Sequence, residues 1–407
     1  MVCIENSGRN KGKAGSQMAL KKQVLIVSQV IPQWYVDVLA EALGEGVHID
    51  IITGSNVRGN VIKSPKHEAD SLKSRLVCWY RHFRFVNQWM KENQSVHYDL
   101  IFAVSNPPIN AYLGLKLKKK FHVPFIYMNW DIYPQVIEST IRNPAVKVIC
   151  RLWHEWNSVN YPKVNQMLTI GEQMAVSTNN SLREKIKITC IPIAADIGLL
   201  QPMEKQENPF CQEYGLCDKF IVLYSGKMGM GHNIEVILEA ARVLQNQRKI
   251  CFVFIGNGPK YPIVEQFIKE NQSENIKLFP LQPDDIFPYS MACGDIGIVT
   301  QEASMAHLFM PSKVYSMMAC GEAIVGICTK KDDLHSLLEN NPIGIAVTDG
   351  SADTLAREIL HLYMDKVTLE RYKKCARITA EEKFSSITVT KQYKELFKRY
   401  MLQGEIG

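Results

Sequence analysis

The chain has 407 residues, about twice the length of a typical domain, so we expect two domains. Apolar residues make up 46% and charged residues 22%, which is globular composition and excludes a disordered protein. The net charge of +6 suits anionic small ligands or a membrane surface, and it is too small to indicate a nucleic-acid partner.

The 11 cysteines include no C-x-x-C pair and no close Cys/His cluster, so the sequence predicts neither a zinc site nor a disulfide framework. Residues 1–22 are basic and lack the apolar core of a secretion signal, and no segment is long and apolar enough to span a bilayer. We therefore expect a flexible basic tail at 1–22 and a reducing, cytoplasmic location.

Short apolar, β-branched runs alternate with helical patterns through residues 23–200, which predicts a first Rossmann-like α/β domain. The expected strands are 23–29, 48–53, 100–104, 125–128, 166–169 and 187–191, and the expected helices are 34–43, 108–121 and 145–159.

Periodicity is lost over residues 201–219, which we interpret as an interdomain linker, and a second alternating series fills a domain at 220–384. Its expected strands are 220–224, 251–255, 276–279, 296–299, 323–327 and 345–347, with helices at 233–244, 261–271, 312–319, 334–340, 353–364 and 368–383. A last helix, 388–401, lies in a terminal segment, 385–407.

The loop after the strand 220–224 carries Gly226, Gly229 and Gly231 together with Lys227 and His232. Glycines allow close backbone approach, and free N–H groups at the start of the next helix attract anions. This pattern favours phosphate binding over the alternative, a flexible turn with a solvated lysine.

A second candidate anion site is the sequence Pro311-Ser312-Lys313, where Ser312 is a good helix N-cap. A lysine in the first helical turn opposes the helix dipole, which is easier to understand if an anion binds there. An ordinary capped helix is an equally good interpretation. A third loop, Gly256-Asn257-Gly258-Pro259, is a tight turn, and no loop completes a dinucleotide fingerprint or a P-loop.

Asp131 directly follows the strand 125–128. Ligands bind at the carboxyl ends of parallel strands, so this carboxylate is a candidate for catalysis or acceptor binding, although it could equally cap a turn. The chain contains no D-x-D pair, so we expect no metal site and predict that lysine, histidine and helix N-termini neutralise a bound diphosphate.

An apolar stripe at helical spacing runs through residues 72–90, surrounded by basic side chains. It fits an amphipathic helix on anionic lipid, and it fits a helix that faces a protein core equally simply. The stripe consists of Leu72, Leu76, Trp79, Phe83, Val86 and Met90, and the basic residues are Lys73, Arg75, Arg81, Arg84 and Lys91.

In their order and spacing, these motifs resemble the GT-B glycosyltransferases of family 4, in the subgroup that builds bacterial cell-surface polysaccharides. The resemblance covers nearly everything after residue 22 and rests on Ser105-Asn106-Pro107-Pro108, Asp131-Ile132-Tyr133-Pro134, 222–233, Gly256-Asn257-Gly258-Pro259 and Pro311-Ser312-Lys313. It implies two Rossmann-like domains facing a cleft, with the last helix crossing back to the first domain.

The resemblance also implies that the C-terminal domain binds a nucleotide-sugar donor, with UDP-sugar expected, and that no further cofactor is needed. The implied donor-binding residues are Gly226, Lys227, Gly229, His232, Gly256, Asn257, Leu281, Gln282, Ser312 and Lys313, and Asp131 is the catalytic candidate. The acceptor is expected to be a glycan or a polyprenyl-diphosphate-linked glycan, transfer to be retaining, and the enzyme to contact the inner face of the membrane peripherally.

The chain departs from this pattern at Leu308 and Ser316, where many relatives carry paired glutamates, and at Trp130, where they carry histidine. Two alternatives remain open: a UDP-sugar epimerase of the same fold, and a catalytically silent protein that binds nucleotide sugars.

Overall fold

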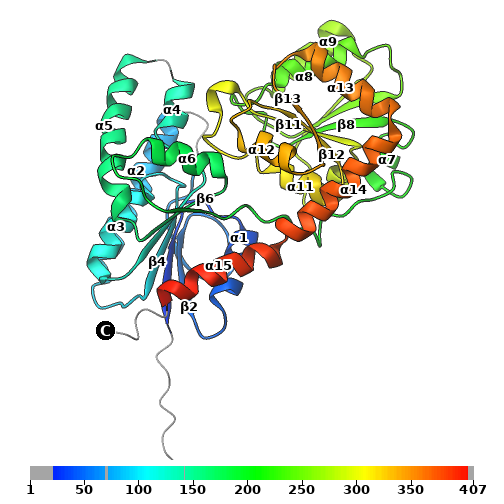
Figure 1. Ribbon diagram of the computed structural model, residues 1–407. Helices are drawn as coiled ribbons and strands as arrows, with labels where there is room; N and C mark the ends of the chain where they lie inside the picture. The colour runs from blue at the N-terminus through cyan, green and yellow to red at the C-terminus, as the bar shows by residue number, and fades with distance from the viewer. Residues whose placement is uncertain (1–21, 69–71, 142, 402–407) are drawn as a thin grey trace, which may run out of the picture.

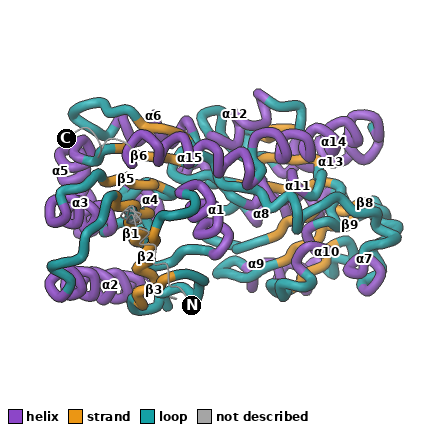
Figure 2. Tube along the Cα trace, turned by 90° about the horizontal axis from the view of Figure 1, so that it is seen from below, coloured by secondary structure: helices purple, strands orange, loops and turns teal. Residues whose placement is uncertain are grey.

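The computed structural model describes residues 22–68, 72–141 and 143–401, so the predicted basic tail lies outside the described residues up to residue 21. Two parallel sheets, each flanked by helices, form two Rossmann-like domains that lie side by side (Figures 1 and 2). The α/β architecture expected from the sequence is therefore confirmed.

The N-terminal sheet has the order β3-β2-β1-β4-β5-β6-β7 and reverses direction of winding between β1 and β4. Its strands are β1 Gln23–Val27, β2 His48–Thr53, β3 Asn60–Lys63, β4 Leu100–Val104, β5 Phe125–Asn129, β6 Gln166–Thr169 and β7 Ile188–Cys190. Its helices are α1 Gln33–Leu43, α2 Leu72–Glu92, α3 Asn110–Phe121, α4 Gln135–Thr140, α5 Pro144–Asn160 and α6 Glu172–Asn180, with a 3-10 turn at Tyr161–Lys163.

The C-terminal sheet has the order β10-β9-β8-β11-β12-β13 and reverses between β8 and β11. Its strands are β8 Phe220–Ser225, β9 Ile250–Ile255, β10 Ile276–Phe279, β11 Ile296–Thr300, β12 Ala323–Ile327 and β13 Gly344–Val347. The helices are α7 Pro209–Glu213, α8 Ile234–Val243, α9 Tyr261–Asn271, α10 Phe287–Met291, α11 Lys313–Ala319, α12 Asp333–Asn340, α13 Ala352–Met364, α14 Lys366–Lys383 and α15 Ser386–Met401, with a 3-10 turn at Ala303–Met305.

Both reversals have a functional consequence, because ligands bind open α/β sheets beyond the carboxyl ends of the strands at such points. In the C-terminal domain, the loops at this position follow β8 and β11. They carry Gly226 to His232 and Gln301 to Ser312, which include two of the predicted anion-binding segments.

Helix α15 leaves the C-terminal domain and packs against α1 of the N-terminal domain, where Figure 1 shows it in red below the N-terminal sheet. The hydroxyl groups of Tyr35 and Tyr393 are 2.7 Å apart in a hydrogen bond. The rings of Phe102 and Phe397 meet edge to face with centroids 5.9 Å apart. The last helix thus anchors one domain to the other through buried aromatic side chains.

A polar seam also joins the domains. Asp333 of α12 accepts hydrogen bonds from the backbone N–H groups of Gln173 at 2.8 Å and Met174 at 3.1 Å, so it caps the start of α6 from the opposite domain. A Cβ atom on Gly171 would lie 2.2 Å from this carboxylate, so glycine is needed for the close approach. The N–H of Ile132 donates to the carbonyl of Leu308 at 2.9 Å, which ties the two sides of the cleft together.

The structure adds elements that periodicity did not reveal. The segment expected to be a linker contains α7, in which Phe210 and Cys211 are fully buried and Asn208 caps the first turn. The strand β3 has no fully buried residue and lies at the sheet edge, so it lacks the apolar run that identified the other strands.

Helix α2 divides the predicted apolar stripe into two parts. Val86 and Met90 are buried in the core, whereas Leu76 is 48% exposed. The core-facing interpretation therefore holds for the second half of the helix. In the first half Trp79 is also buried, and Leu76 faces outward. None of the described helices is both long and apolar enough to cross a membrane.

Replacing Phe397 with Ala tests the anchor. Truncating a buried phenylalanine costs about 3–5 kcal/mol, and Phe397 is 3% exposed, so we expect a large loss of unfolding free energy in urea. Ile387→Ala, on the same helix but 74% exposed, is the control and should change it by less than about 0.5 kcal/mol. If Phe397→Ala and Ile387→Ala lower the unfolding free energy by the same small amount, α15 does not hold the domains together.

Candidate active site

A cavity of about 800 Å³ lies between the two domains, at the carboxyl ends of β8 and β11. This volume is within the range of small-molecule binding sites. Both domains contribute to its wall: Trp34, Asp37, Trp130 and Asp131 come from the N-terminal domain, and Gly226, Lys227, His232, Leu281, Ser312, Lys313 and Ser316 come from the C-terminal domain.

Lys313 places a buried positive charge in this cavity. Its Nζ atom lies 3.7 Å from the centroid of the Tyr224 ring, and it is buried with no hydrogen-bond partner among the described residues. Burial lowers the pKa of Lys313 to about 7, because the charged form has lost its water. An ammonium group in this state is a ready partner for an anion.

The glycine loop after β8 leaves room for that charge. Gly226 has φ of 121°, which favours glycine, and a Cβ atom there would lie 3.6 Å from Nζ of Lys313. The loop is fixed by its neighbour, since the N–H groups of Gly226 and Met228 donate to the carbonyls of Ile255 and Asn257 at 2.9 and 2.7 Å. A Cβ atom on Gly256 would lie 2.0 Å from the carbonyl oxygen of Gly226, so Gly256 is required for the packing of the two loops.

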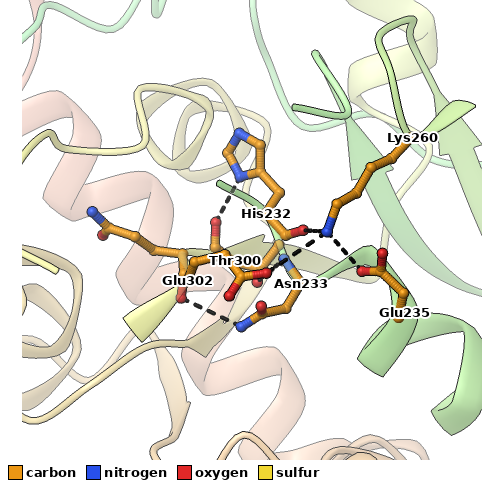
Figure 3. Close-up of polar contacts among 7 residues, drawn as sticks. His232, Asn233, Glu235, Lys260, Thr300 and Glu302 are labelled. Carbon is orange, nitrogen blue, oxygen red and sulfur yellow. Dashed lines mark hydrogen bonds and ion pairs between the residues drawn. The ribbon is translucent and has the colours of Figure 1, made fainter. Parts of the chain in front are cut away.

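His232 is held in one tautomer. Its Nδ1–H donates to the carbonyl oxygen of Thr300 at 2.8 Å, which can only accept (Figure 3). Burial, followed by the charge of Lys313, lowers the pKa of His232 to about 4, so the ring is neutral near pH 7. The other nitrogen, Nε2, therefore presents a lone pair that accepts hydrogen bonds.

Lys260 holds the loop around His232 in place through a hydrogen bond and two carboxylate contacts (Figure 3). The side chain is almost fully buried, and its Nζ atom lies 2.7 Å from the carbonyl oxygen of His232, 2.8 Å from Glu235 and 3.7 Å from Glu302. With a carboxylate on either side, its charge is compensated within the protein. Lys260 therefore positions the loop, whereas Lys313 remains available to a ligand.

Asp131 stands on the N-terminal side of the cavity. The N–H groups of Trp130 and Asp131 donate to Oγ of Ser105 at 2.9 and 3.3 Å, which fixes the turn after β5. Burial raises the pKa of Asp131 to about 6, and the nearby Arg75 opposes that shift. A carboxylate with a pKa near neutrality can accept a proton during a reaction.

The family described as "Glycosyl transferases group 1" matches residues 219–365, which include the loops around Lys227, His232 and Lys313. The probable glycosyltransferase WbjE of Pseudomonas aeruginosa is 22% identical over 298 residues, covering 69% of this chain and 74% of WbjE. The putative colanic acid biosynthesis glycosyl transferase WcaI of Escherichia coli is 29% identical over 177 residues, covering 43% of this chain and 42% of WcaI.

Solved structures show the same two-domain fold. Alr3699/HepE of Anabaena, crystallised in complex with UDP and glucose, superposes with a TM-score of 0.70 at 15% identity, covering 93% of this chain and 100% of HepE. Sucrose-phosphate synthase from Thermosynechococcus elongatus gives a TM-score of 0.73 at 14% identity, covering 94% and 100% of the two chains. The chain therefore has the GT-B fold, and its C-terminal domain is similar to group 1 glycosyl transferases.

Most of the predicted site residues lie together on the cavity wall: Asp131, Gly226, Lys227, His232, Leu281, Ser312 and Lys313. Gly229, Gly256, Asn257 and Gln282 do not line it. Gly229 packs near the ring of His232, and Asn257 supports the β8 loop through its carbonyl. Gln282 bonds to the carbonyl of Pro280 at 2.9 Å.

Two details of the predicted anion sites differ in the structure. Ser312 occupies the N-cap position of α11 as expected, but its backbone angles are helical and its side chain makes no capping hydrogen bond. At the start of α8, the N–H groups of Asn233 and Ile234 already donate to Thr300 Oγ1 and to the carbonyl of His232. The lysine side chains, and not these N–H groups, provide the positive charge of the cavity.

Sequence reasoning missed several residues that shape the site. Trp34, Asp37 and Glu41 of α1 line the cavity from across the cleft, and nothing in their helical spacing distinguished them from an ordinary amphipathic helix. Lys260 had a signal, since it follows the turn Gly258-Pro259, but only the fold brings it under His232. In the described part of the chain, no cluster of three or more His, Cys, Asp or Glu side chains is arranged to hold a metal ion.

Replacing Lys313 with Met should stabilise the unliganded protein. A buried cation without a counter-ion destabilises the fold, and an apolar side chain of similar volume removes that penalty, on the order of 1–4 kcal/mol. The unfolded chain binds the proton up to its ordinary pKa of 10.5, and the folded chain only up to about 7. The increase in unfolding free energy of Lys313→Met over the wild type should therefore be greatest at or below pH 7 and shrink as the pH approaches 10.

Melting temperature measured against pH checks this, with Lys227→Met at the exposed neighbour as the control. A Lys313→Met protein that melts below the wild type at pH 7 would show that the lysine has a stabilising partner.

Proposed function

We propose that this glycosyltransferase moves a sugar from a UDP-sugar to a glycan acceptor, either a polysaccharide or a lipid-linked oligosaccharide, without a metal ion. The observation that carries the proposal is the unpartnered, buried ammonium of Lys313 beside the glycine loop that also carries Lys227. The donor diphosphate supplies the missing negative charge, and two lysines neutralise it where other enzymes use a metal.

The relatives support the donor and acceptor classes. HepE was solved with UDP-glucose in addition to UDP and glucose, and WcaI is named for colanic acid biosynthesis. Retention of anomeric configuration rests on the resemblance to family 4 alone.

We assign His232 to a hydroxyl group of the donor and not to its diphosphate. Because its neutral ring presents a lone pair at Nε2, it fits a sugar hydroxyl that donates a hydrogen bond better than a phosphate oxygen, which only accepts. We assign the diphosphate to Lys227 and Lys313, and a hydroxyl of the donor to His232.

Asp131 is the proposed proton acceptor. A bond forms between the acceptor oxygen and the anomeric carbon of the donor sugar, while the bond from that carbon to the diphosphate breaks and UDP leaves with the electron pair. The proton of the acceptor hydroxyl passes to the carboxylate of Asp131, which is ionised above its pKa of about 6.

UDP affinity tests the donor site. Lys227→Ala and Lys313→Ala should each weaken binding roughly tenfold, because a charge-assisted hydrogen bond to an anion is lost. Since Lys313 must be protonated to bind UDP and has a pKa of about 7, the wild-type affinity should fall as the pH rises from about 7 to 9. Titration calorimetry in EDTA measures both effects, and adding Mg²⁺ should change neither.

Two variants serve as controls. Lys313→Arg keeps its charge and should lose the pH dependence, whereas Lys227→Ala should keep it. Unchanged affinity in both alanine variants would place the donor elsewhere, and complete loss of wild-type binding in EDTA would contradict the metal-independent proposal.

Asp131→Asn tests catalysis. Asn caps turns as well as Asp does, so a merely structural Asp131 would tolerate the change. We expect instead an unchanged melting temperature and UDP affinity, with transfer slowed on the order of a hundredfold. Wild-type turnover should fall below about pH 6, as Asp131 becomes protonated. A variant that transfers sugar at the wild-type rate would remove Asp131 from the mechanism, and a wild type that binds UDP-sugars but transfers none would favour the silent alternative.

A further inference from the structure

The first half of α2 and the neighbouring α5 present apolar side chains to solvent. Leu152, Ile149 and Val148 of α5 are 68%, 61% and 60% exposed. Tyr80 and Leu76 of α2 are 57% and 48% exposed. Large apolar residues gathered in this way on one surface mark an interaction site and not ordinary surface scatter.

Between these helices lies an almost wholly apolar groove of about 600 Å³. Its walls come from α2, α5 and the start of α3, and they consist of Leu76, Trp79, Tyr80, Phe83, Pro108, Ile109, Tyr112, Ile149, Leu152, Trp153 and Trp156. Figures 1 and 2 both place these helices on the side of the N-terminal domain that faces away from the C-terminal domain. Domain packing therefore does not cover the groove.

The helices that form this apolar surface carry more basic than acidic residues. Helix α2 carries five Lys and Arg residues and one Glu, and α3 carries four lysines and no acidic residue. On α5, Lys147 and Arg151 flank the exposed apolar residues. An exposed apolar surface on predominantly basic helices is complementary to a membrane with anionic headgroups, because the apolar side chains enter the interface and the cations stay at the headgroups.

We propose that the face formed by α2 and α5 docks on an anionic membrane surface. This deepens the proposed function, since it rests on a lipid-linked acceptor and assigns the surface that brings the enzyme to it. The sequence suggested only α2 as a lipid-binding helix. The structure adds α5, with its exposed Ile149 and Leu152, as the second half of the same face.

The docking face lies next to the proposed catalytic residue. The Trp79 ring meets Tyr133 edge to face at 5.8 Å, and Tyr133 stacks on Trp153 at 6.0 Å. Tyr133 is two residues from Asp131, and Arg75 of α2 acts electrostatically on the carboxyl of Asp131. A lipid-linked glycan in the docked membrane would thus have its headgroup beside Arg75 and its sugar near Asp131.

Vesicle sedimentation of the full-length protein tests the proposal. Vesicles of phosphatidylcholine with about 30% phosphatidylglycerol should bind the wild type, whereas pure phosphatidylcholine should not, and about 0.5 M salt should release it. Ile149→Glu with Leu152→Glu should abolish binding. Arg81→Glu with Arg84→Glu should weaken it about 30-fold, on the scale of roughly fivefold for each basic residue at an anionic surface.

The controls are exposed residues of the C-terminal domain. Val367→Glu, at a position 82% exposed, and the pair Arg371→Glu with Lys374→Glu should leave vesicle binding unchanged. Melting temperature and UDP affinity should match the wild type in every variant. If the wild type does not bind UDP, the proposed donor site is wrong, and the vesicle result stands independently of it.

Three outcomes would overturn the docking proposal. The first is equal vesicle binding by the wild type and the two charge-altered α2 and α5 variants. The second is a concentration-dependent dimer that Ile149→Glu with Leu152→Glu converts to a monomer, with no vesicle binding, because the face would then join two copies of the chain. The third is binding of farnesyl diphosphate without any vesicle binding, because the groove would then hold one lipid chain and not a membrane surface.

Discussion

The ammonium group of Lys313 is buried over the ring of Tyr224, and no carboxylate of the described chain neutralises it. A folded protein tolerates such a charge only where something else repays the lost hydration, which makes the cavity incomplete without an anion. The rest of the C-terminal site follows from this constraint. Gly226, whose φ of 121° favours glycine, lies beside Nζ, and the loops at the switch point between β8 and β11 line the cavity that would admit a ligand. The second lysine of the loop, Lys227, adds charge without adding burial, since it is exposed.

Lys260 in the same domain is also buried, but the charge of its ammonium group is compensated by carboxylates. Glu235 and Glu302 face its ammonium group, and the carbonyl of His232 completes its hydrogen bonding. Because these partners come from α8 and from the loop after β11, Lys260 fixes the relative position of the two loops that form the cavity wall. The two buried lysines thus differ in their neighbours: Lys260 holds the loop in shape, whereas Lys313 has no partner that compensates its charge and is the proposed ligand for the donor diphosphate.

The sequence predicted what is local and missed what is created by packing. Buried strands were found because runs such as 125–128 and 220–224 are continuous in apolar residues. The loops after such strands pointed to Lys227, Lys313 and Asp131, which line the cavity. Ser312 takes the expected N-cap position but makes no capping hydrogen bond, because capping depends on backbone angles, which the residue type does not fix. Lys260 and the exposed face of α5 were missed for another reason: a lysine beside a turn and an amphipathic helix become informative only when the fold shows what lies opposite them.

Leu308 shows how the two domains can form one site without the paired glutamates common in similar enzymes. Its side chain is buried, and its backbone carbonyl accepts the N–H of Ile132, the residue after Asp131. A carbonyl performs this task with any side chain, so replacing glutamate with leucine leaves the link across the cleft intact. Asp131 is then positioned by two backbone contacts, one to Ser105 within its own domain and one from its neighbour to Leu308 in the other. Because one contact crosses the cleft, the position of Asp131 relative to Lys227 and Lys313 depends on how the two domains meet. The aromatic anchor of α15 and the Asp333 cap on α6 therefore help to set the geometry of the proposed site as well as the stability of the fold.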